Sequence, residues 1–366
     1  MKNLIQIASH FIPESHIASV DSFGSGHIND SYFVKTAPES DGYYILQRIN
    51  HQIFKNVPQL TDNILKVTTH IRERLRKEPK KFPDFQVFQQ VQCKTGNFFF
   101  QDDAGNYWRM IDYIRGSKSY DVVESPEMAY QAGKGFGIFQ ELTSDLDANS
   151  LYEVLPNFHN IVYRLENFRR TLENDPAGRV KSTQNEISFV EQRAGEMHKI
   201  LSLGESGAIP MRVTHNDTKI NNVLFNDRNK AISVVDLDTV MPGYILYDFG
   251  DAIRTGASTS AEDEPDLEKV NFSLPLFEAY TTGYLEIAKG FLSQPEIDNL
   301  AFSAKFMTYL IGLRFLTDHL DGDRYYKIHF PGHNLVRAMA QFRLVENMEE
   351  KFGEMEEVVS NGFSNK

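Results

Sequence analysis

Residues 214–238 read THNDTKINNVLFNDRNKAISVVDLD, and the order of oxygen-bearing side chains in this stretch decides the expected fold. Asp217 lies in a polar loop, Asn222 follows within the same loop, and Asp236 ends an apolar run. Transfer of a phosphoryl group needs a carboxylate beside the attacking hydroxyl and oxygen ligands for the magnesium ion that bridges the nucleotide phosphates. The spacing therefore predicts a kinase-type phosphotransfer centre.

The residues between these side chains predict a hairpin that brings Asp236 back to the loop. Residues 223–225 and 231–235 are apolar, the second run is rich in β-branched residues, and the Asn, Asp and Lys cluster between them is typical of a turn. We expect Asp217 to act as the base or to orient the acceptor hydroxyl. Asn222 and Asp236 are expected to bind magnesium, because this ion prefers hard oxygen ligands.

Three further polar residues of the stretch have roles that the sequence leaves open. Asp238 points to the same side of an extended segment as Asp236, so it either assists the metal or caps the next turn. His215 belongs to the candidate catalytic group, but we expect it to brace the loop through hydrogen bonds rather than to carry a proton. Lys219 either meets the transferred phosphate or is solvated.

Residues 248–250 spell Asp-Phe-Gly, the magnesium-binding tripeptide of protein kinases. Their position argues against that role, because they lie beyond a Pro-Gly turn, whereas Asp236 ends a predicted strand nearer to the loop. We interpret Asp248 as a carboxylate that supports the loop, through His215 or Arg254.

These motifs resemble the aminoglycoside phosphotransferase and choline kinase group, whose fold is similar to that of a protein kinase. Within this group the sequence is most similar to bacterial N-acetylhexosamine 1-kinases, which act at the anomeric hydroxyl of the sugar. The segments that carry the resemblance are FGSGHIND at 23–30, YILQRIN at 44–50, WRMIDYI at 108–114, LPNFHN at 155–160, HNDTKINNVLF at 215–225, VVDLDTVMPGYILYDFGD at 234–251 and GLRFL at 312–316.

The resemblance implies an α+β fold with two lobes. We expect residues 1–115 to form a β-rich, nucleotide-binding lobe, because short β-type runs and turns fill this part of the chain. Residues 116–366 are expected to form a larger, mainly helical lobe with the catalytic loop and the acceptor pocket, because apolar residues recur there at helical spacing. The implied cofactors are ATP and Mg²⁺.

Candidate nucleotide contacts lie on a glycine hairpin and on the strand predicted over residues 43–49. Gly24 and Gly26 would let backbone N–H groups approach phosphate oxygens, and His27 could add a side-chain hydrogen bond. The strand lacks the lysine that kinases use to pair the phosphates. Gln47 and Arg48 point to opposite faces, so one of them could replace this lysine but not both.

The backbone after the last strand of this lobe is expected to pair with adenine. This makes Asp112, Tyr113 and Ile114 candidate base contacts, although an aromatic side chain in a strand, such as that of Tyr113, is more typical of packing. Trp108 is interpreted as a core residue.

The acceptor pocket is expected among the C-terminal helices that face the Asp217 loop. The resemblance implies that Arg314 and Tyr325 contact the sugar. An arginine on an otherwise apolar helix face needs a polar partner, which a sugar hydroxyl or an amide carbonyl would provide. From the residues alone, an internal ion pair of Arg314 with Asp318 or Asp321 is the simpler expectation.

Composition limits the classes of partner. The formal net charge of −12 argues against nucleic acids and anionic membranes, which both need clustered cations, and favours a small-molecule acceptor. A single cysteine, Cys93, and an N-terminus without a long apolar run predict a cytoplasmic protein.

Two alternatives stay open at this point. One is a kinase of the same fold that phosphorylates another small alcohol, such as an aminoglycoside, choline, ethanolamine or homoserine. The other is a nucleotide-binding pseudokinase, since the strand lysine is missing. Asp217, Asn222 and Asp236 count against the second alternative.

Overall fold

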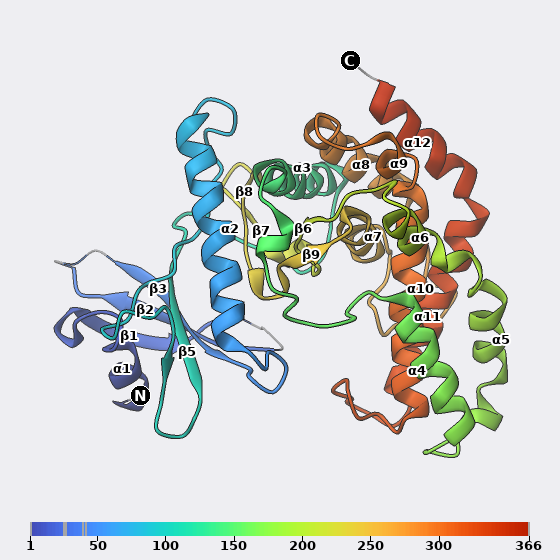
Figure 1. The fold of residues 1–366 in the computed structure, drawn as a ribbon, viewed down its shortest axis with the longest axis horizontal. Coiled ribbons are helices and arrows are strands. Elements are labelled where there is room, and N and C mark those ends of the chain that lie inside the picture. Colours follow the sequence, from blue (N-terminus) through green and yellow to red (C-terminus); the bar gives the residue numbers. More distant parts are fainter. Residues whose placement is uncertain (1, 25–27, 39, 41, 365–366) are drawn as a thin grey trace.

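The structure is a computed structural model that describes residues 2–24, 28–38, 40 and 42–364 (Figure 1). An antiparallel sheet forms the N-terminal part, and helices dominate the remainder, as the α+β expectation requires. The sheet has the order β1-β2-β3-β5-β4. Its strands are β1 (Ile17–Ser22), β2 (Asp30–Thr36), β3 (Tyr43–Ile49), β4 (Phe100–Gln101) and β5 (Tyr107–Asp112).

The sheet separates two hydrophobic cores. The smaller core lies between the sheet and helix α1 (Lys2–Ala8), and it includes Trp108, which is 6% exposed and donates its indole N–H to Asp102 over 2.8 Å. Helix α2 (Val57–Lys77) belongs to the larger core and packs against α3. The side chain of Asn56 caps α2 by accepting the N–H of Gln59.

The helical part surrounds two short antiparallel strand pairs. Its α-helices are α3 (Pro126–Thr143), α4 (Ile161–Asn174), α5 (Gln184–Arg193), α6 (Lys199–Glu205), α7 (Ile245–Gly256), α8 (Leu274–Ala288), α9 (Gln294–Ile297), α10 (Leu300–Leu320), α11 (His333–Glu350) and α12 (Phe352–Ser364). Its strands are β6 (Arg212–Thr214), β7 (Val223–Phe225), β8 (Ala231–Val234) and β9 (Met241–Gly243). The 3₁₀ helices that matter for the site are η5 (Ile220–Asn222) and η6 (Leu237–Thr239).

Helices α3 and α8 approach each other unusually closely. A Cβ atom at Gly133 would lie 2.2 Å from the Tyr280 carbonyl oxygen, and one at Gly283 would lie 2.0 Å from the Tyr130 carbonyl oxygen. Only glycine permits this backbone contact. The contact fixes the position of α3, and a side chain of α3 helps to support the catalytic loop.

Several of these helices are interrupted. Residues 194–198 separate α5 from α6, and residues 298–299 separate α9 from α10. No helix was predicted over α7, although Asp248, Asp251 and Arg254 recur at helical spacing among its apolar residues.

The predicted lobe boundary after Arg115 lies in the segment that joins β5 to α3, and the division at that residue stays a prediction. Among the described residues, no helix combines the length and the apolar character needed to cross a membrane.

Candidate active site

Two antiparallel strand pairs place the catalytic loop. Strand β6 pairs with β9, β7 pairs with β8, and residues 215–222 join β6 to β7. The predicted hairpin is therefore present. It returns the chain to the loop, where the N–H of Val235 donates to the carbonyl oxygen of Asn222 over 2.9 Å. Asp236 follows directly.

A buried carboxylate shapes the first half of the loop. Asp248, on α7, accepts the backbone N–H groups of His215 at 2.8 Å and Asn216 at 2.7 Å. Gln140 of α3 donates to the same carboxylate over 3.0 Å. Asp248 thus contacts the loop at His215, as the sequence suggests, but through the backbone of that residue. Its other proposed partner, Arg254, is paired instead with Asp251.

Asn216 adopts a left-handed backbone conformation with φ of 65°. Non-glycine residues rarely adopt this conformation, and asparagine tolerates it better than most because of its short polar side chain. The Asn216 side chain donates to Thr214 Oγ1 and to the Thr239 carbonyl oxygen, both over 2.9 Å. These bonds connect the loop to the segment that follows Asp236.

His215 has the geometry of a bracing residue. Its imidazole is fully buried between the edges of Phe136 and Phe139. The Nδ1 atom accepts the N–H of Asp217 at 3.3 Å, so Nε2 carries the proton and donates to the Val235 carbonyl oxygen at 2.9 Å. This tautomer is assigned from the two partners.

The carboxylate of Asp217 is accessible from outside the loop, and its side chain is 25% exposed. Asn222 donates its amide to Asp217 Oδ2 over 3.2 Å and to the Asp217 carbonyl oxygen over 2.8 Å. Lys219 Nζ lies 3.0 Å from Asp217 Oδ1, and the negative charge of Asp217 raises the pKa of Lys219. Lys219 therefore stays protonated beside Asp217.

Asp236 joins this group from a left-handed position, with φ of 59°. Removal from bulk water, together with the negative charges of Asp238 and Asp217, raises the pKa of Asp236 to about 7. Crowded carboxylate and amide oxygens are the donor set that Mg²⁺ binds, because this ion takes one or two carboxylates and completes its shell with water and substrate phosphates. Asn222 and Asp236 fit that ion.

Asp238, the other candidate metal ligand, is occupied by contacts to the N-terminal sheet. It is 3% exposed, its Oδ1 forms an ion pair with Arg109 of β5, and its Oδ2 accepts a hydrogen bond from Asn29 over 2.6 Å. Its geometry is that of a link between the two parts of the molecule.

The candidate phosphate contacts of the N-terminal part do not all lie on the same face of the sheet. Gly24 has φ of 72°, which favours glycine, whereas Gly26 and His27 lie outside the described residues. Gln47 accepts a hydrogen bond from Arg109 and so points toward the catalytic loop. Arg48 points away from it and forms an exposed ion pair with Asp30.

Each of the three candidate base contacts has a polar group that is hydrogen-bonded within the protein. Asp112 Oδ1 accepts the N–H of Gln89 at 2.5 Å, the Tyr113 N–H donates to the Tyr43 carbonyl oxygen at 2.9 Å, and the Ile114 carbonyl oxygen accepts from Ser117 Oγ at 2.5 Å.

The Tyr113 ring belongs to an aromatic cluster that sequence reasoning missed. It packs edge-on against Phe33 at 5.2 Å and Phe23 at 6.0 Å between centroids, and Phe23 is 41% exposed. Because Phe23 immediately precedes the glycine hairpin, this cluster offers an apolar surface for a nucleotide base.

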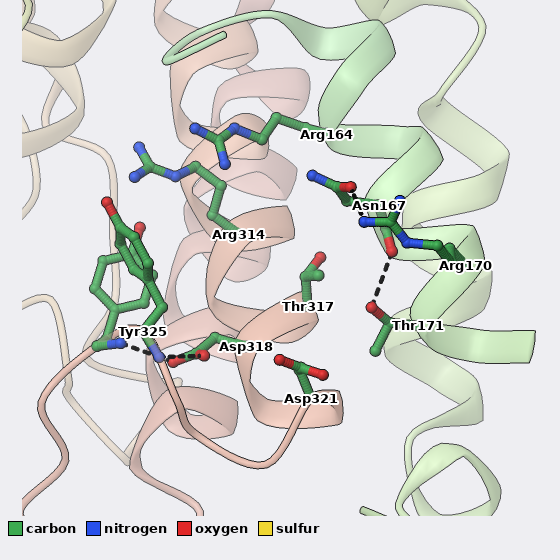
Figure 2. A pocket seen from close by; sticks show the side chains of 10 residues that line it. Arg164, Asn167, Arg170, Thr171, Arg314, Thr317, Asp318, Asp321 and Tyr325 are labelled. Atoms are coloured by element: carbon green, nitrogen blue, oxygen red, sulfur yellow. Dashed lines mark hydrogen bonds between the residues drawn. The ribbon is translucent and has the colours of Figure 1, made fainter. Parts of the chain in front are cut away.

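A pocket of about 240 Å³ opens between α4, α10 and the segment after α10 (Figure 2). Arg314 on α10 is 8% exposed, and its guanidinium lies over the rings of Phe158, Tyr326 and Tyr325 at 4.8, 5.7 and 5.9 Å. Within the described residues Arg314 forms neither a hydrogen bond nor an ion pair. Tyr325 is 64% exposed beside it.

The ion pair expected between Arg314 and Asp318 or Asp321 does not form within the described chain. Asp318 instead accepts the backbone N–H groups of residues 324–326, at 2.9, 2.7 and 2.9 Å. It thereby shapes the segment that carries Tyr325.

Two residues near Arg314 were not anticipated. The guanidinium of Arg164 lies beside that of Arg314 (Figure 2), and it donates to the Phe158 carbonyl oxygen over 3.0 Å. Burial, followed by the positive charge of Arg314, lowers the pKa of Arg164 to about 10. His159 is 6% exposed, lies next to the Asn216 backbone, and has no hydrogen-bond partner at either ring nitrogen.

Comparison with known proteins places this geometry in a family. Residues 19–285 match the family described as phosphotransferase enzymes. The chain belongs to this phosphotransferase family. The match begins within β1, includes β2–β9 and α7, and so contains the Asp217 loop and its Asp248 support.

Solved structures share the fold of this phosphotransferase at low sequence identity. A microcompartment-associated aminopropanol kinase is 14% identical with a TM-score of 0.62, over 97% of this chain and 98% of that one. An aminoglycoside phosphotransferase from Alicyclobacillus acidocaldarius is 12% identical with a TM-score of 0.61, over 97% and 96%. A choline/ethanolamine kinase family protein from Mesorhizobium loti is 13% identical with a TM-score of 0.57, over 98% of each chain. The kinase-like fold is thereby confirmed.

The buried His159 predicts an acid-sensitive contribution to stability. Burial and the nearby positive charge of Arg314 lower its pKa from 6.5 to about 3. Between pH 6.5 and pH 3, His159 is therefore protonated in the unfolded chain and neutral in the folded chain. The stability that depends on a neutral His159 is complete above pH 6.5 and is lost as the pH falls toward 3. Between pH 7.5 and pH 5, we expect His159 to account for a loss of about 2 kcal/mol.

The measurement compares urea unfolding of the wild-type phosphotransferase and His159→Phe at the two pH values. The variant retains an aromatic ring without a titrating group, so its stability should fall less on acidification. Equal losses in both proteins would contradict a neutral, buried His159.

Proposed function

We propose that this phosphotransferase transfers the γ-phosphoryl group of ATP to the anomeric hydroxyl of an N-acetylhexosamine and releases the sugar 1-phosphate. The observation that carries the proposal is the pair of arginines, Arg164 and Arg314, that line the pocket without a carboxylate partner within the described residues. The acceptor is N-acetylglucosamine or N-acetylgalactosamine.

The charge of this pair separates the possible acceptors. Aminoglycosides, choline, ethanolamine and aminopropanol are cations, which the two guanidinium groups repel. The two carboxylates that also line the pocket already have partners: Asp318 accepts backbone N–H groups of residues 324–326, and Asp321 pairs with Arg324. Hydroxyl and acetamide carbonyl oxygens accept hydrogen bonds from arginine. A buried arginine without a polar partner is costly, and a sugar bound in the pocket would remove that cost for Arg314.

The acceptor contacts would come from both sides of the pocket. Arg314 donates to the acetamide or a hydroxyl oxygen, and Tyr325 covers the sugar from the exposed segment after α10.

The phosphotransfer side would use the oxygens of the catalytic loop. Asp217 accepts or orients the proton of the anomeric hydroxyl, and the neighbouring Lys219 neutralises charge on the transferred group. Asn222 and Asp236 would hold Mg²⁺, which neutralises the negative charge of the nucleotide phosphates when bound. Asp238 serves in the link to Arg109 rather than in the metal site, and His215 braces the loop.

One other acceptor has a charge that the arginines could bind. Homoserine is a zwitterion: its carboxylate could pair with Arg164 and Arg314, its ammonium group would have to face Asp318 or Asp321 of the same pocket, and its hydroxyl would then be phosphorylated. A pseudokinase is disfavoured because Asp217, Asn222 and Asp236 lie together.

Product analysis tests the proposal. The protein is incubated with ATP, Mg²⁺ and separate acceptors: N-acetylhexosamines, unmodified hexoses, homoserine, amino alcohols and an aminoglycoside. We expect phosphorus NMR to detect an anomeric phosphate with the N-acetylhexosamines. Asp217→Asn is the control, and its turnover should be at least ~10²-fold lower because proton transfer is lost. Turnover of the cationic acceptors alone would refute the proposal.

A substitution in the pocket tests the acceptor contact. Arg314→Gln should raise KM for the N-acetylhexosamine by at least ~10-fold, because it removes a hydrogen bond from a charged donor, and it should leave KM for ATP unchanged. Steady-state kinetics with each substrate varied provide the readout.

Arg170→Gln is the matched control. Arg170 lines the same pocket, but it is exposed and donates to Asn167 on its own helix over 2.5 Å, so its loss should leave both KM values near wild type. An unchanged sugar KM in Arg314→Gln would remove Arg314 from the acceptor site.

A further inference from the structure

A chain of side-chain contacts crosses from the N-terminal sheet to the η6 turn that follows Asp236. Ser31 Oγ accepts from Gln47 Nε2 at 3.0 Å, and Gln47 Oε1 accepts from Arg109 Nε at 2.8 Å. Arg109 then forms an ion pair with Asp238, whose second oxygen accepts from Asn29 at 2.6 Å. Both members of the ion pair are nearly inaccessible, with side chains 5% and 4% exposed.

Strand register explains why the cation comes from β5. Gln47 occupies the inward-facing position that was considered for the missing phosphate lysine, and it is directly opposite Arg109 on the neighbouring strand. Side chains of directly opposed residues on one face of a sheet lie within reach of each other. Arg109 can therefore place its charge where the side chain of Gln47 ends.

The other cation near this position does not reach the catalytic loop. Arg48 is on the opposite face of β3 and forms an ion pair with Asp30, with side chains 46% and 49% exposed. The missing charge is thus supplied by a residue on a different strand.

We propose that Arg109 replaces the strand lysine as the cation that positions the nucleotide site, by holding Asp238 against the N-terminal sheet. Asp238 is two residues after Asp236, within the η6 turn, so anchoring Asp238 fixes Asp236 relative to the sheet. Asn29 immediately precedes β2 and donates to the same carboxylate, which fixes this end of β2 relative to Asp236 as well.

The Asn29 side chain also accepts the N–H of Asn50 at the end of β3 over 2.9 Å, so Asn29 connects the end of β3 to the η6 turn. Arg109 is a positioning residue, because it acts through Asp238 and Asn29. The inference rests on the proposed metal role of Asp236 but not on the identity of the acceptor.

Nucleotide binding without acceptor tests this inference. Isothermal titration calorimetry measures Kd for Mg·ATP, or for Mg·GTP if the wild-type protein prefers it. The main variant is Arg109→Gln combined with Asp238→Asn, which leaves no unpaired buried charge that would unfold the protein. We expect Kd to rise at least ~10-fold in this variant while its thermal unfolding stays cooperative.

Two further variants complete the design. Asn29→Ala removes one hydrogen bond of Asp238 and no charge, so it should fold normally and raise Kd by at least ~3-fold. Arg48→Gln removes an exposed arginine of the same sheet and should leave Kd unchanged. Where activity is measurable, KM for ATP should rise in the first two variants while KM for the acceptor stays constant.

The outcomes separate this inference from the proposed function. A wild-type Kd in folded Asn29→Ala or in the folded double variant would overturn the positioning role of the ion pair. If the wild-type protein itself binds neither Mg·nucleotide, the nucleotide part of the proposed function fails as well, and the role of Arg109 fails with it.

Discussion

The catalytic loop depends on one buried carboxylate, that of Asp248. Two successive backbone N–H groups, those of His215 and Asn216, point to the same place and donate to its two oxygens. Buried N–H groups without acceptors are costly, and the left-handed conformation of Asn216 is unfavourable by itself. The carboxylate offsets both costs, and Gln140 holds it from α3, which glycine contacts fix against α8.

The shape of this loop determines where the functional charges lie. Asp217, Asn222 and Asp236 gather at the phosphotransfer side, where negative charge requires a metal cation or Lys219 as compensation. Arg164 and Arg314 lie in the pocket between α4 and α10, which Asp318 and Asp321 also line. In the proposed function this pocket receives the acceptor. The Arg109–Asp238 ion pair ties the η6 turn that follows Asp236 to the sheet.

Sequence alone predicted the parts of this site that are local. Short-range patterns predict the hairpin between β7 and β8, and the structure contains it. The same patterns single out Asp217, Asn222 and Asp236, whose roles stay a prediction. Sequence alone could not predict the partner of Asp238, because Arg109 is 129 residues distant along the chain. Arg164 and His159 were missed for the same reason, since only the packing of α4 against α10 brings them to Arg314. Helix α7 was missed although its polar residues recur at helical spacing, because the segment was interpreted through its Asp-Phe-Gly tripeptide and the preceding Pro-Gly turn.

The most direct test of the role of Asp248 is hydrogen exchange at the His215 and Asn216 amides in the wild-type protein and in Asp248→Asn. The substitution replaces one acceptor oxygen by an amide donor. We expect at least one of these amides to exchange ~10-fold faster or more, with loss of phosphotransfer, while amides of the α10 core keep their protection. Unchanged protection at both amides together with normal turnover would contradict the claim that this carboxylate holds the catalytic loop.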